Sequence, residues 1–146
     1  MASAVVKLRA AANANDADAF EDALSGCSEL PASKALCQIL VSTLVQDWHT
    51  RHEDVVSNIQ RLKCMNAVIA LELRAVDCPA YLQWDENLAL ARKCTWALAD
   101  IGTADALDAL KRLAQAESLL VRSFARKRLD RWENEMVRKS DDTSDF

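Results

Sequence analysis

The chain of 146 residues contains only two glycines and two prolines. Tight turns between β-strands usually need glycine or proline, so β-hairpins are not expected in this protein. Alanine and leucine are abundant while β-branched residues are sparse, and this balance favours helix. The composition therefore predicts an all-α protein with long helices.

The sequence also lacks any apolar run long enough to cross a bilayer, although 51% of its residues are hydrophobic. Lys7 and Arg9 lie among alanines near the start and no apolar block follows them, so no signal peptide is evident. A length of 146 residues suits one domain with a core of its own. We therefore expect a single cytoplasmic domain without membrane contact.

The cysteines lack metal-binding spacing. Successive cysteines lie 10, 27, 14 and 16 residues apart, so there is no CxxC motif and no zinc pattern. The odd count argues against a disulfide framework, and in a reducing compartment such side chains usually pack in the core. We expect no metal and no cofactor. The five are Cys27, Cys37, Cys64, Cys78 and Cys94.

Charge is distributed unevenly along the chain, whose formal net charge is −4. Residues 1–100 carry a net charge of −4, residues 101–139 carry +3, and residues 140–146 carry −3. The acidic first two thirds suggest a basic partner and do not suit nucleic acid as the main ligand.

Start and stop signals divide the chain into about eight expected helices. Gly26 and Gly102 are placed to end the second and sixth helices. We expect a folded domain over residues 1–139 and a disordered acidic tail over 140–146. The residues expected to cap or open helices two to eight are Asn15 or Asp16, Pro31, Thr50 with Glu53, Asn66, Asp85, Thr103 and Ser118.

A weak internal repeat relates the two halves of the chain. Leu62, Ala67 and Leu71 recur as Ile101, Ala106 and Leu110, each at an offset of 39 residues. The helices are then expected to pair as 2+3, 4+5 and 6+7, with an irregular insert at 76–85. Recurring helix pairs with such a period predict a right-handed α-solenoid.

The string LARKCTWALADIGTADALDALKRLA resembles the short HEAT-like repeat of the phycobilisome-lyase type. In that pattern a helix ending in Trp-Ala-Leu-Gly-x-Ile-Gly precedes x-x-Ala-Leu-x-x-Leu; here Ala99 replaces the usual glycine. The match covers residues 88–132, where Val121-Arg122 matches the start of the next repeat. The segments DWHTRHEDVVSNIQRLKCMNAV and YLQWDENLALARKCTWALADIG also resemble small bacterial HEAT-repeat proteins similar to immunity proteins of polymorphic toxin systems.

This resemblance implies a non-enzymatic protein that occludes the active site of a cognate toxin. Turns between solenoid repeats fall on one edge, here 47–52, 76–85 and 115–118. Aromatic side chains ringed by carboxylates on that edge would suit a basic cleft on the toxin. The expected partner-binding residues are Trp48, His49, His52, Glu53, Asp54, Tyr81, Trp84, Asp85 and Glu86.

Other interpretations stay open at this point. Trp48 also suits closure of a helix end against the core, and Asp85 and Glu86 also suit capping. Asp47, His49, His52, Glu53 and Asp54 have ligand-type side chains, but HEAT-like iron hydroxylases need several His-Glu pairs and this chain has one. A bilin-lyase-like chaperone and a general scaffold are the alternative functions. We expect a monomer when the protein is free.

Overall fold

The computed structural model describes residues 3–86 and 88–144, and these ranges contain helices and no β-strand. The predicted all-α class and the eight expected α-helices are confirmed. Two short 3-10 helices, η1 and η2, supplement them. The bounds are α1 Ala4–Asn13, α2 Ala17–Ser25, α3 Lys34–Leu44, α4 His52–Leu62, η1 Met65–Ala67, α5 Val68–Val76, η2 Ala80–Leu82, α6 Ala89–Ile101, α7 Ala104–Leu113 and α8 Leu119–Ser144.

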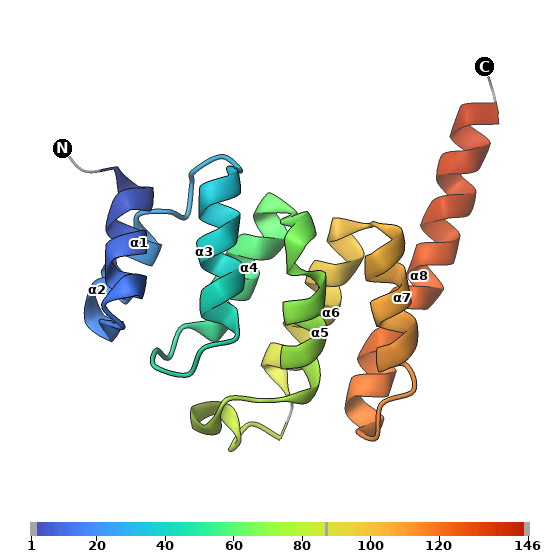
Figure 1. Ribbon diagram of the computed structural model, residues 1–146. Helices are drawn as coiled ribbons and strands as arrows, with labels where there is room; N and C mark the ends of the chain where they lie inside the picture. The colour runs from blue at the N-terminus through green and yellow to red at the C-terminus, as the bar shows by residue number, and fades with distance from the viewer. Residues whose placement is uncertain (1–2, 87, 145–146) are drawn as a thin grey trace.

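The helices form two layers (Figure 1). Helices α1, α3, α5 and α7 contact one another in series, and α4, α6 and α8 do the same behind them. Between the layers, α1 packs on α2, α3 on α4, α5 on α6, and α7 on α8. The predicted pairs 2+3 and 4+5 are therefore wrong, because the connections after α2 and α4 carry α3 and α5 across to the first layer. Helices α6 and α7 do contact each other.

Successive helices alternate in direction, so the connections gather on two edges (Figure 1). We call the edge formed by residues 45–51, 77–86, 88 and 114–118, together with the helix turns that border them, the turn edge; it lies at the bottom of Figure 1. The connections after α2, α4 and α6 lie at the top. The turn edge holds most of the residues that the sequence assigns to partner binding.

Several helix ends follow their local sequence signals. Asp16 Oδ1 accepts the backbone N–H of Ala19 at 3.1 Å, and Thr103 Oγ1 accepts that of Ala106 at 3.2 Å. Gly102 ends α6 with a φ of 72°, a left-handed conformation that glycine adopts without steric cost. These predicted helix ends are confirmed because each depends on residues close by in the chain.

Other helix starts differ from the prediction. Helix α3 begins at Lys34 and not at Pro31, because Ser33 Oγ accepts the Leu36 N–H at 3.1 Å and forms the cap. Helix α6 begins at Ala89, although Asp85 Oδ2 still accepts the Ala89 N–H at 3.1 Å. Both sequence signals correctly indicated that a helix starts nearby, but a competing cap or turn moved each helix start by a few residues.

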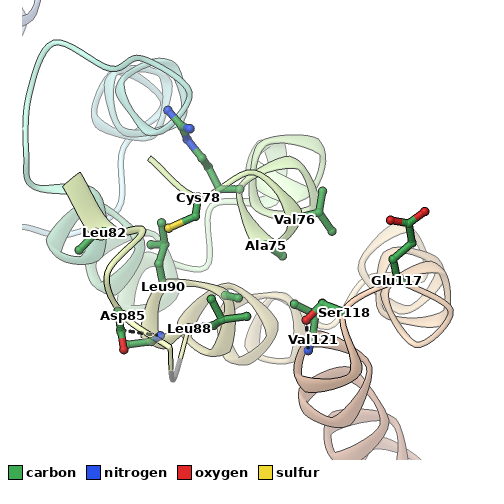
Figure 2. Close-up of a pocket in the computed structure, with 14 residues that line it drawn as sticks. Ala75, Val76, Cys78, Leu82, Asp85, Leu88, Leu90, Glu117, Ser118 and Val121 are labelled. Carbon is green, nitrogen blue, oxygen red and sulfur yellow. Dashed lines mark hydrogen bonds between the residues drawn. The ribbon is translucent and has the colours of Figure 1, made fainter. Parts of the chain in front are cut away.

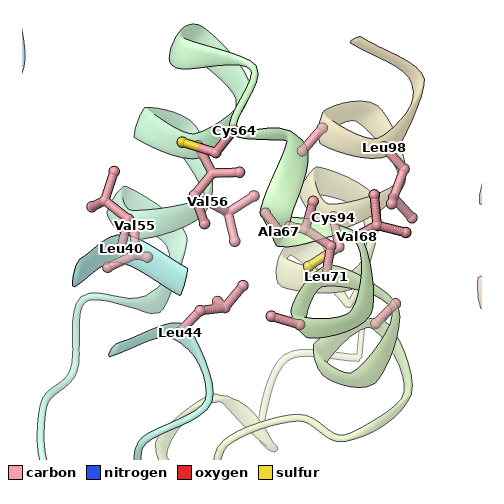
Figure 3. Close-up of a cluster of buried hydrophobic side chains, with 14 of the residues drawn as sticks. Leu40, Leu44, Val55, Val56, Cys64, Ala67, Val68, Leu71, Cys94 and Leu98 are labelled. Carbon is pink, nitrogen blue, oxygen red and sulfur yellow. The ribbon is translucent and has the colours of Figure 1, made fainter. Parts of the chain in front are cut away.

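The core runs between the two layers as one continuous cluster of buried side chains (Figure 3). Leu40 and Leu44 of α3 meet Val55 and Val56 of α4, and Leu71 of α5 continues the cluster toward α6. Burying such aliphatic side chains stabilises the fold by roughly 1.5–3 kcal/mol each. Packing of the layers therefore supplies most of the stability.

Helix α8 runs to Ser144 and so continues through residues 140–144, where the sequence predicts a disordered tail. No glycine or proline lies between Leu119 and Ser144, so nothing in the local sequence ends the helix. Residues 145–146 of the predicted tail lie outside the described residues, and the domain boundary at 139 stays a prediction.

A disulfide joins Cys37 of α3 to Cys64 in the turn after α4. The expectation that the cysteines stay free thiols is therefore wrong for this pair, although Cys64 does pack in the core. Their Cα atoms lie 5.6 Å apart, within the range that a disulfide spans, because the turn folds back onto the start of α3. Cys27 and Cys94 are buried free thiols, as expected.

Loss of the Cys37–Cys64 bridge should destabilise the protein. Cys37→Ser opens a loop with a sequence separation of 27 residues and should lower the free energy of unfolding by about 2–4 kcal/mol. Urea denaturation under oxidising conditions measures this difference. The wild type in excess dithiothreitol should match the variant, and equal stability of both proteins without reductant would contradict the bridge.

Candidate functional site

The turn edge is organised around two buried histidines. His49 and His52 have exposed fractions of 1% and 0%, and their rings stack with centroids 4.1 Å apart. The ring contacts continue on both sides, from Phe20 of α2 through Trp48 to His49, and from His52 to Tyr81 of η2. Three segments far apart in the sequence are thus joined by one row of rings.

Hydrogen bonds specify the protonation of both rings. His49 Nδ1 accepts the Arg51 N–H at 3.0 Å, so its Nε2–H donates to the Thr43 carbonyl at 2.7 Å. His52 Nε2–H donates to the Gln46 carbonyl at 2.6 Å, which leaves Nδ1 to accept the Tyr81 hydroxyl proton at 2.8 Å. Both rings are therefore neutral, with the proton on Nε2.

Burial keeps the two rings neutral. Desolvation lowers the pKa of His52 to about 4, although its hydrogen bond to the Gln46 carbonyl opposes this. Desolvation also lowers the pKa of His49, opposed by its bond to the Thr43 carbonyl. A second positive charge in the stack would repel the first and also Arg74 nearby.

Arg74, on α5, is a buried residue of the turn edge that the sequence analysis missed. Its Nε–H donates to the Leu44 carbonyl at 2.7 Å, and one terminal nitrogen donates to the Gln46 carbonyl at 3.2 Å and to Asp47 Oδ1. The bond from Arg74 lowers the pKa of Asp47. A clue existed in the sequence, because Arg74 follows buried Leu71 by three residues and so falls on the apolar face of α5.

Together these side chains replace the local cap that the sequence predicts for α4. Arg51 occupies the N-cap position, and no side-chain oxygen caps α4 in the described chain, so Thr50 does not act as its cap. The His52 backbone N–H donates instead to the Tyr81 hydroxyl at 3.1 Å. The end of α3 and the start of α4 are thus satisfied by tertiary contacts.

The nine predicted partner-binding residues separate by exposure. His49 and His52 are buried and present no surface, so their assignment to partner contact is wrong; packing and hydrogen bonding within the protein account for both. Trp48 is half-buried and closes the end of α3 by packing against Phe20. This is the alternative role that the sequence left open for Trp48. Glu53, Tyr81 and Asp85 are half-buried, whereas Asp54, Trp84 and Glu86 are exposed.

An apolar pocket of about 410 Å³ opens on the turn edge (Figure 2). It lies between the end of α5, residues 78–85 and 88 of the following connection, the start of α6 and the turn before α8. Its size falls within the usual range for ligand pockets. Its walls include Val76, Leu82, Leu90 and Val121, and its polar members include Asp85 and Glu117.

Cys78, which also lines this pocket, is a half-buried free thiol. Burial raises its pKa, and Asp85 nearby raises it further, so the thiol stays protonated near neutral pH. A protonated thiol is a poor nucleophile. The pocket therefore suits binding of an apolar group better than covalent chemistry.

The histidines are also engaged in ways that oppose metal binding. All four ring nitrogens of His49 and His52 already bond to protein groups. Among the side chains that the structure describes, at residues 3–86, 88–132 and 134, no group of three or more His, Cys, Asp or Glu is arranged to hold a metal ion. Over the same part of the chain, no helix combines the length and apolar character needed to span a membrane.

Comparison with known proteins leaves the geometry as the guide to function. No family model, no curated protein and no solved structure matches this chain.

Removing the Tyr81 hydroxyl should destabilise the turn edge. Tyr81→Phe leaves the His52 backbone N–H and Nδ1 without their partner, and should lower the free energy of unfolding by about 1–3 kcal/mol. Urea denaturation measures the loss. Trp84→Phe is the matched control, since Trp84 is exposed on the same segment and should leave stability unchanged. Equal stability of Tyr81→Phe and wild type would contradict the bonding assigned to Tyr81.

Stability should also fall in mild acid. Unfolded His52 binds a proton below its ordinary pKa of about 6.5, whereas folded His52 resists protonation down to about 4. The unfolded state thus binds more protons between these values, so stability is full above pH ~6.5 and falls by about 3 kcal/mol toward pH ~4.

Urea denaturation as a function of pH tests this dependence. His52→Gln retains a hydrogen-bond donor and removes one titrating ring, so its stability should fall less steeply with acid than that of the wild type. Ring titration by NMR gives the pKa of each histidine directly. Stability that stays constant from neutral pH through this window would show that the histidines are not held neutral by burial.

Proposed function

We propose that this protein is a non-catalytic binding module whose two helical layers form a right-handed α-solenoid of HEAT-like hairpins. We further propose that it is a cytoplasmic immunity protein, which neutralises a cognate bacterial toxin by covering the toxin's active site. The observation that carries this proposal is the composition of the turn edge. This edge is acidic, and it carries the exposed Trp84 on the segment that also lines the apolar pocket.

The charge of the turn edge supports a basic partner. Its three segments carry five carboxylates, at Asp47, Asp77, Asp85, Glu86 and Glu117, and one guanidinium, at Arg51. Arg74, which borders them, adds a second guanidinium and forms ion pairs with Asp47 and Asp77, so negative charge remains in excess. Arg51 forms an ion pair with Glu21 of α2, so its charge is offset within the protein. The excess of negative charge would accelerate association with a basic cleft and favour it over acidic surfaces, nucleic acid included.

Apolar groups on the same edge support a tight contact. Trp84 has an exposed fraction of 77%, and exposed tryptophans are frequent anchors of protein interfaces. The pocket lined by Val76, Leu82 and Leu90 would accept one apolar side chain of the toxin. The buried histidines and Arg74 support this surface by holding its loops in place, which limits the entropy lost on binding.

A bilin-lyase-like chaperone is the second candidate, and the pocket volume of about 410 Å³ is the observation that favours it. Such a protein would bind an apolar chromophore there. An absorbance spectrum after incubation with a linear tetrapyrrole separates the two functions, because an immunity protein should show no bound visible band.

Charge reversal on the turn edge should weaken binding to the toxin, taken to be the protein encoded directly upstream of this chain. Glu53→Lys combined with Asp54→Lys places positive charge opposite the basic cleft, and should raise the dissociation constant at least about tenfold. Trp84→Ala removes an anchor and should cost about 2 kcal/mol of binding energy. Titration calorimetry with the purified toxin domain measures both effects.

Glu29→Lys is the matched control. Glu29 is exposed in the connection after α2, on the opposite edge, so its reversal should leave affinity unchanged. Co-expression should also protect cells from the toxin. Failure of the pair to form a complex would overturn the immunity function, whereas an unchanged affinity of the Glu53/Asp54 variant would overturn the turn edge as the binding surface.

A further inference from the structure

Helix α5 carries an exposed apolar stripe that neither the core nor the proposed function uses in full. Ile69, Leu73 and Val76 of α5 recur at intervals of four and three residues, so they share one face. Met65 of η1, just before α5, lines a surface depression together with Ile69 and so extends the stripe. The exposed fractions of Met65, Ile69, Leu73 and Val76 are 67%, 83%, 48% and 60%. Isolated exposed apolar residues are common, but three along one helix face with a fourth beside them form a patch of the kind that marks an interface.

The two sides of this stripe carry opposite charge at its Met65 end. On the α3 side, Lys34 and Lys63 line a shallow depression with Met65, and no carboxylate contributes to its described lining. On the α7 side, Asp105 and Asp108 line another depression with Met65 and Ile69. Helix α5 lies between α3 and α7 in the same layer (Figure 1), so the two charged groups flank the stripe.

The acidic side keeps its charge despite a nearby arginine. Arg112 also lines the depression on the α7 side, but it makes two hydrogen bonds to the Glu72 carboxylate, at 2.7 and 2.8 Å. Three carboxylates thus surround one guanidinium, which leaves an excess of two negative charges. Lys34 and Lys63 supply two positive charges opposite them.

From this pattern we infer that α5 is the centre of a symmetric interface between two copies of this chain. A two-fold axis along α5 keeps the direction of the helix and exchanges its two sides. It therefore places Lys34 and Lys63 of each copy opposite Asp105 and Asp108 of the other copy, which gives two equivalent charge contacts. The two stripes meet in parallel between these charge contacts.

The alternative two-fold axis, across α5, does not fit as well. That axis makes the two α5 helices antiparallel and brings the α3 side of one copy against the α3 side of the other. The lysines would then face the α3 side of the partner copy, and the aspartates would face its α7 side. The charge pairs would then be lost. Parallel packing is the arrangement that buries the apolar stripe and also satisfies its flanks. This inference replaces the free monomer expected from the sequence, and it does not depend on the toxin.

Sedimentation equilibrium of the purified full chain tests the interface. The wild type should show a monomer–dimer equilibrium, and Ile69→Glu should raise the dimer dissociation constant at least roughly 100-fold, because it places a charge in an apolar contact. Leu119→Glu is the matched control: Leu119 is exposed at the start of α8, outside the α1–α3–α5–α7 layer, so its variant should dimerise like the wild type.

A charge-exchange pair tests the charge contacts that flank the stripe. Asp105→Lys with Asp108→Lys makes one variant, and Lys34→Glu with Lys63→Glu makes the other; each alone should be monomeric, because like charges then face each other. An equal mixture should restore the dimer. Helical circular dichroism confirms that each variant folds. A wild type that stays monomeric up to about 1 mM overturns the interface, and a mixture that stays monomeric overturns the charge contacts at its flanks.

Discussion

The C-terminal end of α3 imposes the constraint on which the turn edge depends. A helix leaves its last carbonyls without intrahelical partners, and the turn after α3 contains no glycine that would close them locally. The Gln46 N–H donates to the Thr43 carbonyl, and side chains complete the bonding of this helix end and of the turn after it. His49 donates to the Thr43 carbonyl, Arg74 to the Leu44 carbonyl, and His52 to the Gln46 carbonyl. One helix end thereby ties α3, α4 and α5 together.

This constraint separates the residues that support the turn edge from those available to a partner. The histidines and Arg74 are buried and bonded within the protein, where neutral rings and a hydrogen-bonded guanidinium tolerate burial. Trp84, Glu86 and Asp54 remain exposed around this support. Under the proposed function, a rigid base beneath exposed aromatic and acidic groups would favour binding, because few loops would need to be ordered on contact with the partner.

Prediction from the sequence succeeded where the physics is local. Asp16 and Thr103 cap helices through bonds to residues three positions away, and Gly102 ends α6 through its own backbone freedom. Prediction failed for His49 and His52, since a polar ring beside an acidic segment looks the same whether it faces solvent or a carbonyl. It also failed for Cys37 and Cys64, whose pairing depends on how the turn after α4 folds.

The sequence by itself therefore determined the all-α class, several helix ends and the acidic character of the turn edge, because propensity, capping and charge are properties of neighbouring residues. Only the tertiary structure decided which polar residues are buried, that Arg74 holds the loop after α3, and that the apolar face of α5 is left uncovered. Those outcomes depend on contacts between residues about 30 positions apart, such as Arg74 with Leu44, and no local pattern encodes them.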